Sequence, residues 1–234
     1  MIWRISAALI LLAQPLSAAS CQNVSFQDNP YTVCQVDLRA NEARLFWRDE
    51  DGALYGGFDT LPADVLIATN GGMYHEDRRP VGHYREAGED VVAPVVGAGP
   101  GNFGLTPNGV LCLMEGRAEI LETERYVAAA PPCRHATQSG PMLVIDGALH
   151  PRFFAESQSR KRRGGVGVSA DGRTLFIAIT RAPVNFHAFA TLFRDGLGTP
   201  NALFTDGTIT RLYDRAAGRA DSGARMGPIL AIMD

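Results

Sequence analysis

The stretch GVGVSADGRTLFIAIT, residues 165–180, determines the fold class that the sequence predicts. Val166 and Val168 alternate with smaller residues before the dipeptide Asp171-Gly172. After this dipeptide, every second residue from Leu175 to Ile179 is a large aliphatic one. A period of two is typical of a strand with one buried face, and Asp-Gly is a common tight turn between strands. The stretch therefore predicts an antiparallel hairpin.

Dipeptides of the same kind recur between short β-rich runs, which indicates that hairpins are frequent along the chain. They are Asp51-Gly52, Asn108-Gly109, Asp146-Gly147 and Asp206-Gly207. The run DVLIATN, residues 64–70, is apolar enough to predict a fully buried strand.

One helix is predicted after the hairpin, with Asn185 as its N-cap and with Gly196 and Gly198 near its end. Its apolar stripe consists of Phe186, Phe189, Ala190, Phe193 and Leu197. A strand, this helix and a further strand up to Asp206 follow one another along the chain. We therefore expect an α+β fold in a single domain, with a mixed or antiparallel sheet core, several hairpins and a few packing helices.

Residues 1–20 have the layout of a secretory signal peptide. Arg4 gives a basic start, an apolar run ends near Leu16, and small residues follow through Ser20. The apolar run is too short to span a bilayer. A buried N-terminal helix is the alternative, and we favour the signal peptide. Residues 21–234 are then the functional domain, with no transmembrane segment after signal removal.

The protein is therefore expected to be exported, either periplasmic or secreted. Cleavage before Cys21 is also compatible with a lipoprotein, but the sequence AASC lacks the leucine that a lipobox prefers three residues upstream. A lipid anchor at Cys21 is thus disfavoured. The formal net charge of −3 gives no field that would attract nucleic acid, so no nucleic-acid partner is predicted.

The four cysteines of an exported chain are expected to form disulfides. Three pairings are possible. We favour Cys21 with Cys34 and Cys112 with Cys133, because each pair closes a short local loop around an extended segment. The sequence has no CxxC motif, and its histidines are scattered. We therefore predict neither a metal site nor a cofactor.

Polar and small residues gather at the ends of several predicted strands. Asn70, Gly71 and Gly72 follow a buried strand, where glycines let backbone N–H groups approach a ligand closely. A tight turn in which Asn70 caps its own backbone explains these residues equally well. Thr137 and Ser139 precede a Gly-Pro turn, and Ser139 lacks the glycines of a nucleophile elbow.

A basic run, RKRR at residues 160–163, directly precedes another strand. Arg163 abuts the strand, so its guanidinium would be well placed to bind a phosphate through two hydrogen bonds. Arg160, Lys161 and Arg162 are expected to be solvated, as charge runs usually are. At the end of the run NALF, Asp206 is a potential site residue, although composition alone favours a hairpin turn there.

Taken together, six stretches resemble the phosphodiester glycosidase family, which includes the lysosomal uncovering enzyme, and in particular a bacterial exported branch. The resemblance covers nearly all of residues 21–234. It is carried by NGGMYHEDRRPVG (70–82), GNFGLTPNGV (101–110), ATQSGPMLVIDGALHP (136–151), RRGGVGVSADG (162–172), VNFHAFATLFRD (184–195) and NALFTDGTITRLY (201–213).

The resemblance implies that water cleaves a glycosyl phosphodiester at the sugar side, which releases the sugar and a phosphomonoester. Asp206 is implied as the catalytic carboxylate, Arg163 as the phosphate ligand and Asn70 as an orienting group. The stable phosphate leaving group reduces the need for a general acid. Further substrate-binding residues are implied at Gly71, Gly72, Tyr74, Asp77, Thr137, Ser139, Gly140, His187, Gly207 and Thr208.

Some of these assignments have alternatives. Asp77, a possible second carboxylate, and His187, in a first helical turn, fit solvated positions equally well. Thr208 stands where the uncovering enzyme's branch has further glycine, so the substrate is expected to differ. A non-catalytic glycan- or cell-wall-binding protein would use the same cleft with Tyr74 and Tyr213 as stacking platforms. An esterase or peptidase using Ser139 has no supporting motif.

Overall fold

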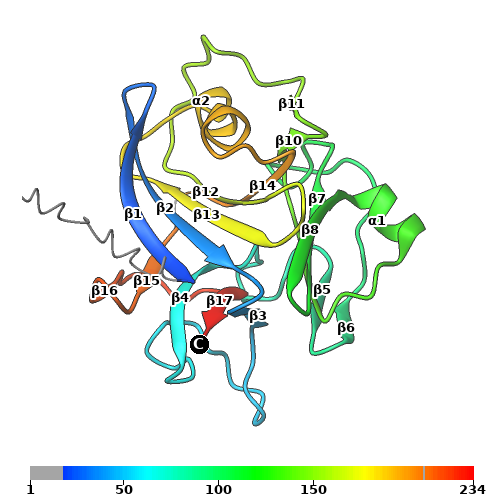
Figure 1. The fold of residues 1–234 in the computed structure, drawn as a ribbon. Coiled ribbons are helices and arrows are strands. Elements are labelled where there is room, and N and C mark those ends of the chain that lie inside the picture. The colour runs from blue at the N-terminus through cyan, green and yellow to red at the C-terminus, as the bar shows by residue number, and fades with distance from the viewer. Residues whose placement is uncertain (1–17, 208) are drawn as a thin grey trace, which may run out of the picture.

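The hairpin at residues 164–180 lies at the centre of a seven-stranded antiparallel sheet in the computed structural model, which describes residues 18–207 and 209–234 (Figure 1). In spatial order its strands are β1 (Ala19–Phe26), β2 (Asn29–Asp37), β13 (Thr174–Thr180), β12 (Gly164–Val168), β14 (Asn201–Asp206), β10 (Met142–Ile145) and β11 (Ala148–Leu149). The predicted hairpin is confirmed, with Val166 opposite Ile177.

Two five-stranded antiparallel sheets complete the fold. The first contains β16 (Arg219–Ala220), β15 (Leu212–Asp214), β4 (Val65–Asn70), β17 (Ile229–Met233) and β3 (Glu42–Phe46). The second contains β6 (Glu89–Val92), β5 (Tyr84–Glu86), β9 (His135–Ser139), β7 (Gly109–Met114) and β8 (Arg117–Glu122). The three sheets enclose a common core that includes Leu45, Ile67, Leu111, Val166 and Leu230. The predicted α+β class with an antiparallel core is confirmed.

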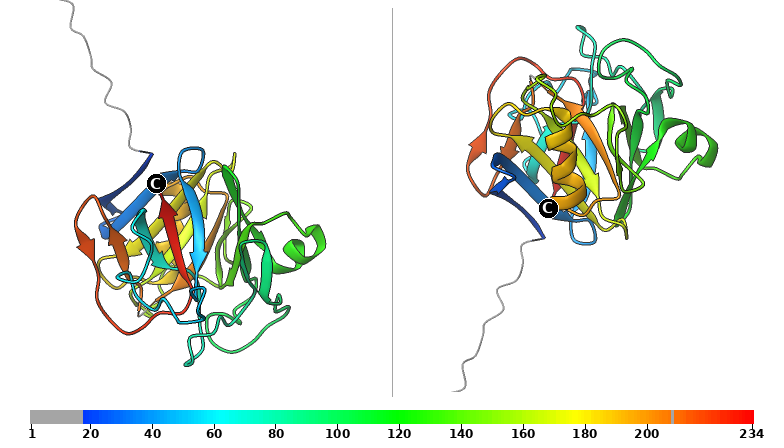
Figure 2. Two further views of the ribbon diagram at one scale, coloured as in Figure 1. Left: turned by 90° about the horizontal axis from the view of Figure 1, so that it is seen from below. Right: turned by 90° about the horizontal axis from the view of Figure 1, so that it is seen from above.

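The predicted helix is confirmed as α2 (Phe186–Thr191), which continues as a π-helical turn, η1 (Leu192–Gly196). The side chain of Asn185 accepts a hydrogen bond from the backbone N–H of Ala188 at 2.8 Å, as expected of an N-cap. The helix connects β13 to β14, which flank β12 on its two sides and therefore run parallel to each other. Figure 2 shows the helix lying across the outer face of this sheet.

The alternation in β12 explains how the helix packs. Val166 and Val168 point into the common core, so the intervening glycines face the helix. A Cβ atom at Gly167 would lie 2.7 Å from the ring of Phe193. One at Gly165 would lie 2.8 Å from the carbonyl oxygen of Leu203 and 3.2 Å from the ring of Phe189. Because each position has a contact below 3 Å, glycine at both allows the helix to pack closely on the strand.

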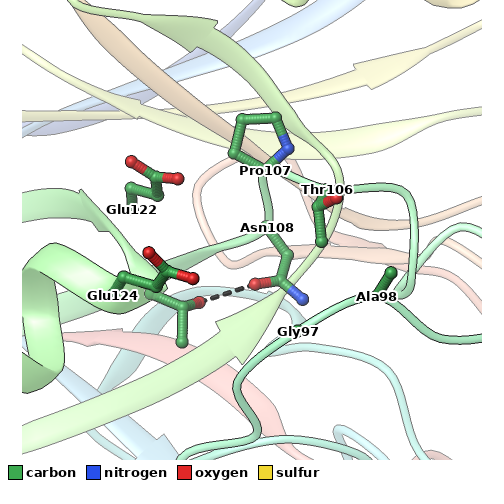
Figure 3. Close-up of a pocket in the computed structure, with 8 residues that line it drawn as sticks. Gly97, Ala98, Thr106, Pro107, Asn108, Glu122 and Glu124 are labelled. Carbon is green, nitrogen blue, oxygen red and sulfur yellow. Dashed lines mark hydrogen bonds between the residues drawn. The ribbon is translucent and has the colours of Figure 1, made fainter.

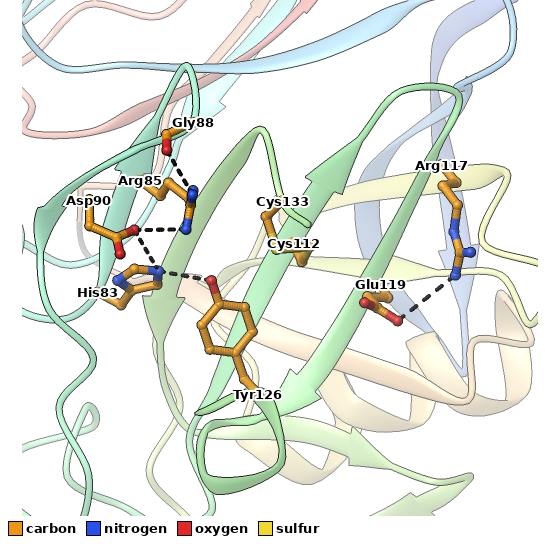
Figure 4. Close-up of a disulfide and its surroundings, with 9 residues drawn as sticks. All are labelled: His83, Arg85, Gly88, Asp90, Cys112, Arg117, Glu119, Tyr126 and Cys133. Atoms are coloured by element: carbon orange, nitrogen blue, oxygen red, sulfur yellow. Dashed lines mark hydrogen bonds and ion pairs between the residues drawn. A yellow bond between two sulfur atoms is a disulfide. The ribbon is translucent and has the colours of Figure 1, made fainter. Parts of the chain in front are cut away.

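Helix α1 (Thr123–Ala129) packs on the sheet that contains β7, and its Tyr126 lies beside the Cys112–Cys133 disulfide (Figure 4). The Tyr126 hydroxyl forms a hydrogen bond of 2.9 Å with Nε2 of the buried His83. The other disulfide, Cys21–Cys34, joins directly opposed residues of β1 and β2. Both predicted pairings are thus confirmed.

The turn predictions divide into two groups. Asp146-Gly147 joins β10 to β11 with φ values of 48° and 82°, and Gly52 and Gly172 also adopt positive φ. These three turns are confirmed. The turn predicted at Asn108-Gly109 is wrong, because Gly109 is the first residue of β7 and pairs with both β8 and β9. Tertiary strand pairing overrides the local turn preference at this position.

The domain prediction of 1–20 and 21–234 stays a prediction, since residues 1–17 lie outside the described part of the chain. Among the described residues, no helix is long and apolar enough to cross a bilayer.

Candidate active site

Asp206 and Asn70 come together although they end strands of two different sheets. Asp206 is the last residue of β14, and Asn70 is the last residue of β4. The Asn70 Nδ2 atom lies 3.5 Å from the Asp206 Oδ2 atom. After Asp206 the chain crosses to β15, which pairs with β4 and not with β14. The hairpin interpretation of Asp206-Gly207 is therefore wrong, because a hairpin requires the two flanking strands to pair.

Asn70 has a fixed orientation. Its side chain is completely buried, and its Oδ1 atom accepts a hydrogen bond of 3.0 Å from the backbone N–H of Arg211. An amide whose oxygen faces a backbone donor must turn its NH₂ group to the other side. That side is occupied by Asp206, so Asn70 presents N–H donors to the carboxylate.

Asp206 is a carboxylate with few compensating partners. Burial raises its pKa to about 6, although hydrogen bonds from the backbone N–H groups of Gly207 and Ile209 act in the opposite direction. Within residues 18–207 and 209–234, Asp206 forms no ion pair. A carboxyl group with such a pKa can both hold and release a proton near neutral pH, as a general base or nucleophile requires.

The five-stranded sheet that contains β9 holds the ends of β4 and β14 in place. The Thr137 hydroxyl donates to the carbonyl of Gly71 at 2.7 Å, and the Ser139 hydroxyl donates to the carbonyl of Thr205 at 3.3 Å. Both side chains come from β9 and are buried. They hold the segments that carry Asn70 and Asp206. Ser139 is fully buried, and none of its hydrogen bonds in the described chain involves a histidine, so the geometry gives no support to the esterase interpretation.

The predicted site glycines allow close backbone packing. A Cβ atom at Gly71 would lie 2.9 Å from the backbone of Ile229, and one at Gly140 would lie 2.7 Å from Cβ of Asn108. Gly72 has a φ of 150°, and a Cβ atom there would lie 2.7 Å from the Thr137 hydroxyl. These three positions therefore require glycine because any side chain would clash with the neighbouring segments.

A cavity of about 660 Å³ opens at Asp206 and Gly207. Three aromatic residues, Tyr74, Phe103 and Phe204, form part of its wall, and Asp206 is the one carboxylate among its lining residues in the described chain. Lys161, Arg162, Arg163 and the imidazole of His75 also line it. A cavity with aromatic surfaces, one carboxylate and three cations is suited to an anionic ligand.

Arg163 differs from its basic neighbours, as predicted. Its side chain is buried, whereas Arg160, Lys161 and Arg162 are exposed. Its Nε and Nη2 atoms donate to the carbonyls of Val184 and Ser159 at 2.9 and 3.0 Å.

The environment of Arg163 leaves one donor group open. The guanidinium carbon lies 3.5 Å from the centre of the Phe186 ring, and burial lowers the Arg163 pKa to about 10, so the group remains cationic at neutral pH. Within the described residues the Nη1 atom makes no hydrogen bond, which leaves it available to a ligand.

Several predicted site residues lie elsewhere. Asp77 is exposed, accepts a hydrogen bond from the N–H of Arg79 and does not line the cavity. His187 is half-buried on α2 and also stays outside the cavity wall. Tyr213 packs against Phe58 with ring centroids 5.9 Å apart. Thr208 lies outside the described residues. Tyr74 lines the cavity, and burial followed by the charge of Asp206 raises its pKa.

Two contributors escaped sequence reasoning. Arg211 supplies the N–H that fixes Asn70, and its sequence signal was its position five residues after Asp206. Residues 100–103, including Phe103, form another part of the cavity wall. Among the described residues, no group of three or more His, Cys, Asp or Glu side chains is arranged to hold a metal ion.

A smaller cavity of about 250 Å³ lies beside Glu122 and Glu124 (Figure 3). Its Asn108 and Thr123 side chains are already hydrogen-bonded to each other at 2.7 Å. Two carboxylates and no cation line it in the described chain, so it would repel a phosphodiester anion. The cavity at Asp206 is therefore the better candidate.

Comparisons with known proteins relate the chain as a whole to other sequences and structures. A sequence profile of the phosphodiester glycosidase family matches residues 63–220. The chain is 32% identical over 218 residues to the uncharacterized protein YigE of Escherichia coli K12, an alignment that covers 90% of this chain and 84% of YigE.

Two solved structures share the fold. The zebrafish N-acetylglucosamine-1-phosphodiester alpha-N-acetylglucosaminidase catalytic domain, auto-inhibited by its pro-peptide, matches with a TM-score of 0.64 and 13% identity over 92% of this chain and 82% of that one. A hypothetical protein from Synechocystis matches with a TM-score of 0.63 and 13% identity over 92% of this chain and 61% of its own. At this identity, the two likenesses concern the fold alone.

Proposed function

Because the chain belongs to the phosphodiester glycosidase family, we propose that it is an exported hydrolase that cleaves a glycosyl phosphodiester at the glycosidic bond. The observation that carries the proposal is the Asp206 carboxylate, which lies 3.5 Å from the buried Asn70 and lines a cavity that also contains Lys161, Arg162 and Arg163. A neutral glycoside would not need such an excess of positive charge.

Asp206 is proposed as the reacting carboxylate. In its ionised form it either removes a proton from the attacking water or attacks the anomeric carbon itself, and in both cases the bond from that carbon to the phosphate oxygen breaks. The bonding electrons leave with the phosphomonoester. Where Asp206 is the nucleophile, water then cleaves the glycosyl ester on Asp206, which releases the sugar and regenerates the carboxylate. The single carboxylate among the cavity's described lining residues supports this scheme, because a phosphate departs as a stable anion without a protonating acid.

Asn70 is proposed to direct the carboxylate. Its NH₂ group faces Asp206 and donates toward the oxygen that is not engaged by the Gly207 N–H. This leaves the carboxylate with one preferred orientation toward the cavity. A positioned carboxylate loses little entropy on reaching the reacting geometry.

The phosphate is proposed to bind the basic side of the cavity. Arg163 contributes its free Nη1 donor, while the exposed Lys161 and Arg162 add charge at the cavity mouth. Arg163 is anchored by two carbonyls and a ring, so its position is set before the ligand arrives. Preorganised charge of this kind stabilises the departing phosphate more than mobile surface charge does.

Export from a bacterial cell, with residues 1–20 as a signal peptide, is part of the proposal. The two disulfides support it, because disulfides persist in oxidising compartments outside the cytoplasm. The second candidate function is glycan or cell-wall binding without hydrolysis, and the aromatic wall formed by Tyr74 and Phe103 favours it.

The two functions are separated by a direct assay. Purified protein of residues 21–234 is incubated with a panel of glycosyl-1-phosphodiesters, and released phosphomonoester is quantified, with Asp206→Asn as the matched control. Release by the wild type and its loss in the variant support hydrolysis. Tight binding of the same compounds with no release by either protein would replace hydrolysis with the binding function.

A further inference from the structure

A second cavity lies next to the candidate active site. It has a volume of about 520 Å³ and lies between residues 55–60 and residues 220–225. Two arginines, Arg211 and Arg225, line it together with the half-buried aromatic residues Tyr55 and Phe58. Like the Asp206 cavity it combines aromatic surface with guanidinium groups, but two carboxylates, Asp59 and Asp221, also line it, and it contains none of the residues assigned to the reaction.

Arg211 is a buried cation without a direct ion pair, although its charge contributes to lowering the pKa of Asp221. Only 8% of this residue is exposed, yet it forms no ion pair among the described residues. Its Nη2 atom donates to the carbonyl of Ala224, while Nε is buried without a partner and Nη1 makes no hydrogen bond in the described chain. Burying an unpaired charge costs several kcal/mol in general, so such a group is usually matched by an anion.

The carboxylates near Arg211 do not supply that match. Asp221 receives two hydrogen bonds from Arg219, at 2.9 and 2.8 Å, and a third from the N–H of Leu212. Its charge is therefore largely committed to Arg219. Asp59 is exposed at the rim of the cavity, where water screens it. The guanidinium of Arg211 therefore attracts an anionic ligand in this cavity more strongly than Asp59 and Asp221 repel it.

Tyr74 connects the two cavities. Its ring lines the Asp206 cavity, and its hydroxyl donates to the carbonyl of Arg225 at 3.4 Å. The backbone of Arg211 also contacts Asn70 directly. A ligand bound at Asp206 that extends past Tyr74 would therefore reach the guanidinium groups of Arg211 and Arg225.

We propose that the cavity lined by Arg211 and Arg225 binds a second anionic group, a phosphate or a carboxylate, at the far end of the substrate's aglycone. This inference rests on the proposed function and specifies its substrate class as phosphodiesters whose aglycone carries a further negative charge. The aromatic rings of Tyr55 and Phe58 provide the apolar surface along which the connecting part of the aglycone packs.

Binding of simple product analogues tests the proposal without turnover. Hexyl phosphate, 1,6-hexanediol bisphosphate and 6-phosphonooxyhexanoate are titrated into the protein of residues 21–234 by calorimetry, with shorter and longer bisphosphates to vary the span. We expect at least one bisphosphate to bind about tenfold more tightly than its monophosphate, the factor expected for one charge-assisted contact of about 1.4 kcal/mol. The carboxylate probe shows whether the second anion must be a phosphate.

The variants locate the effect. Arg225→Ala, at an exposed side chain, should abolish the preference for the bisphosphate while leaving hexyl phosphate binding unchanged, and Arg211→Lys should reduce it. Arg215→Ala, an exposed arginine outside both cavities, is the matched control and should keep the preference. Thermal unfolding checks that Arg211→Lys folds.

Two results would overturn the proposal: equal affinities at every chain length, or a preference that survives in both cavity variants. The outcome is separable from the proposed hydrolysis. If the protein hydrolyses glycosyl phosphodiesters but shows no preference for a bisphosphate, only this inference is wrong. If it prefers a bisphosphate but hydrolyses none of the phosphodiesters, only the proposed reaction is wrong.

Discussion

Asn70 and Asp206 face each other at 3.5 Å across the junction of two sheets, and Asn70 is held there by the backbone N–H of Arg211. The contact is long for a hydrogen bond, so it orients the carboxylate without neutralising much of its charge. Burial then dominates and raises the pKa of Asp206 to about 6.

Asp206→Asn should lower hydrolysis by at least ~100-fold, the low end for loss of a positioned acid or base. Turnover of a glycosyl phosphodiester measures the effect. Asp77→Asn is the matched control, because Asp77 is exposed outside the cavity, and it should retain full activity. Full activity in the Asp206 variant would remove the residue from the mechanism.

The same variant should be more stable than the wild type at high pH. The folded-state pKa of Asp206, about 6, exceeds the unfolded value, so the wild type loses stability as pH rises from about 4 to 6. Asparagine carries no charge to bury. Thermal unfolding should therefore show no difference below about pH 4 and an advantage for Asp206→Asn above pH 6, on the order of 1–3 kcal/mol. A variant less stable at pH 8 would contradict the burial effect.

The pH dependence of kcat/KM should report the same group. If the ionised form of Asp206 reacts, activity should fall about tenfold per pH unit below pH 6. Asn70→Asp would place a second carboxylate next to the first, which should raise the apparent pKa and move this limb upward by at least about one unit. Asn102→Asp, on the cavity wall, is the control for a general change of charge and should leave the limb near 6. Identical shifts in both variants would show a diffuse field and not a direct contact.

Arg163→Lys should weaken turnover of phosphodiesters, because lysine keeps the charge but cannot both hold the two carbonyls and present the Nη1 donor at the cavity, so the two-bond phosphate contact expected from the sequence is replaced by one anchored donor. It should also lower stability, since one ammonium group cannot replace the anchoring bonds to the carbonyls of Val184 and Ser159. Activity is therefore measured well below the unfolding temperature. Arg160→Ala, at an exposed neighbour, should be close to neutral. Equal losses at the two positions would favour a diffuse basic patch.

Local patterns in the sequence were sufficient for the hairpin at residues 164–180, the cap at Asn185 and both disulfides. Each depends on residues that are close along the chain, where periodicity and turn preference act directly. The same local reasoning failed at Asn108-Gly109 and at Asp206-Gly207. In both places a distant strand determines the path of the backbone, and no local preference reveals which strand that is.

The candidate site was recognised from its motifs, but its assembly depends on contacts between residues far apart in the sequence. Thr137 and Ser139 were expected to bind substrate, yet their hydroxyls hold the backbones of Gly71 and Thr205. The burial of the Arg211 side chain could not be predicted from its position after Asp206, because it depends on two loops, residues 55–60 and 220–225, that meet only in the folded protein. Asp77 stood in a matching motif, but the structure turns it toward solvent.

The location of Asn70 and Asp206 on separate sheets has a consequence for substitutions in the core. The distance between the two side chains depends on how the two sheets pack against each other. That packing is determined by the shared core, which includes Leu230, Ile67 and Val166. A core substitution that leaves the protein folded but shifts one sheet would change how Asn70 orients the Asp206 carboxylate. The buried aliphatic residues therefore determine the alignment of the candidate site although none of these three lines its cavity.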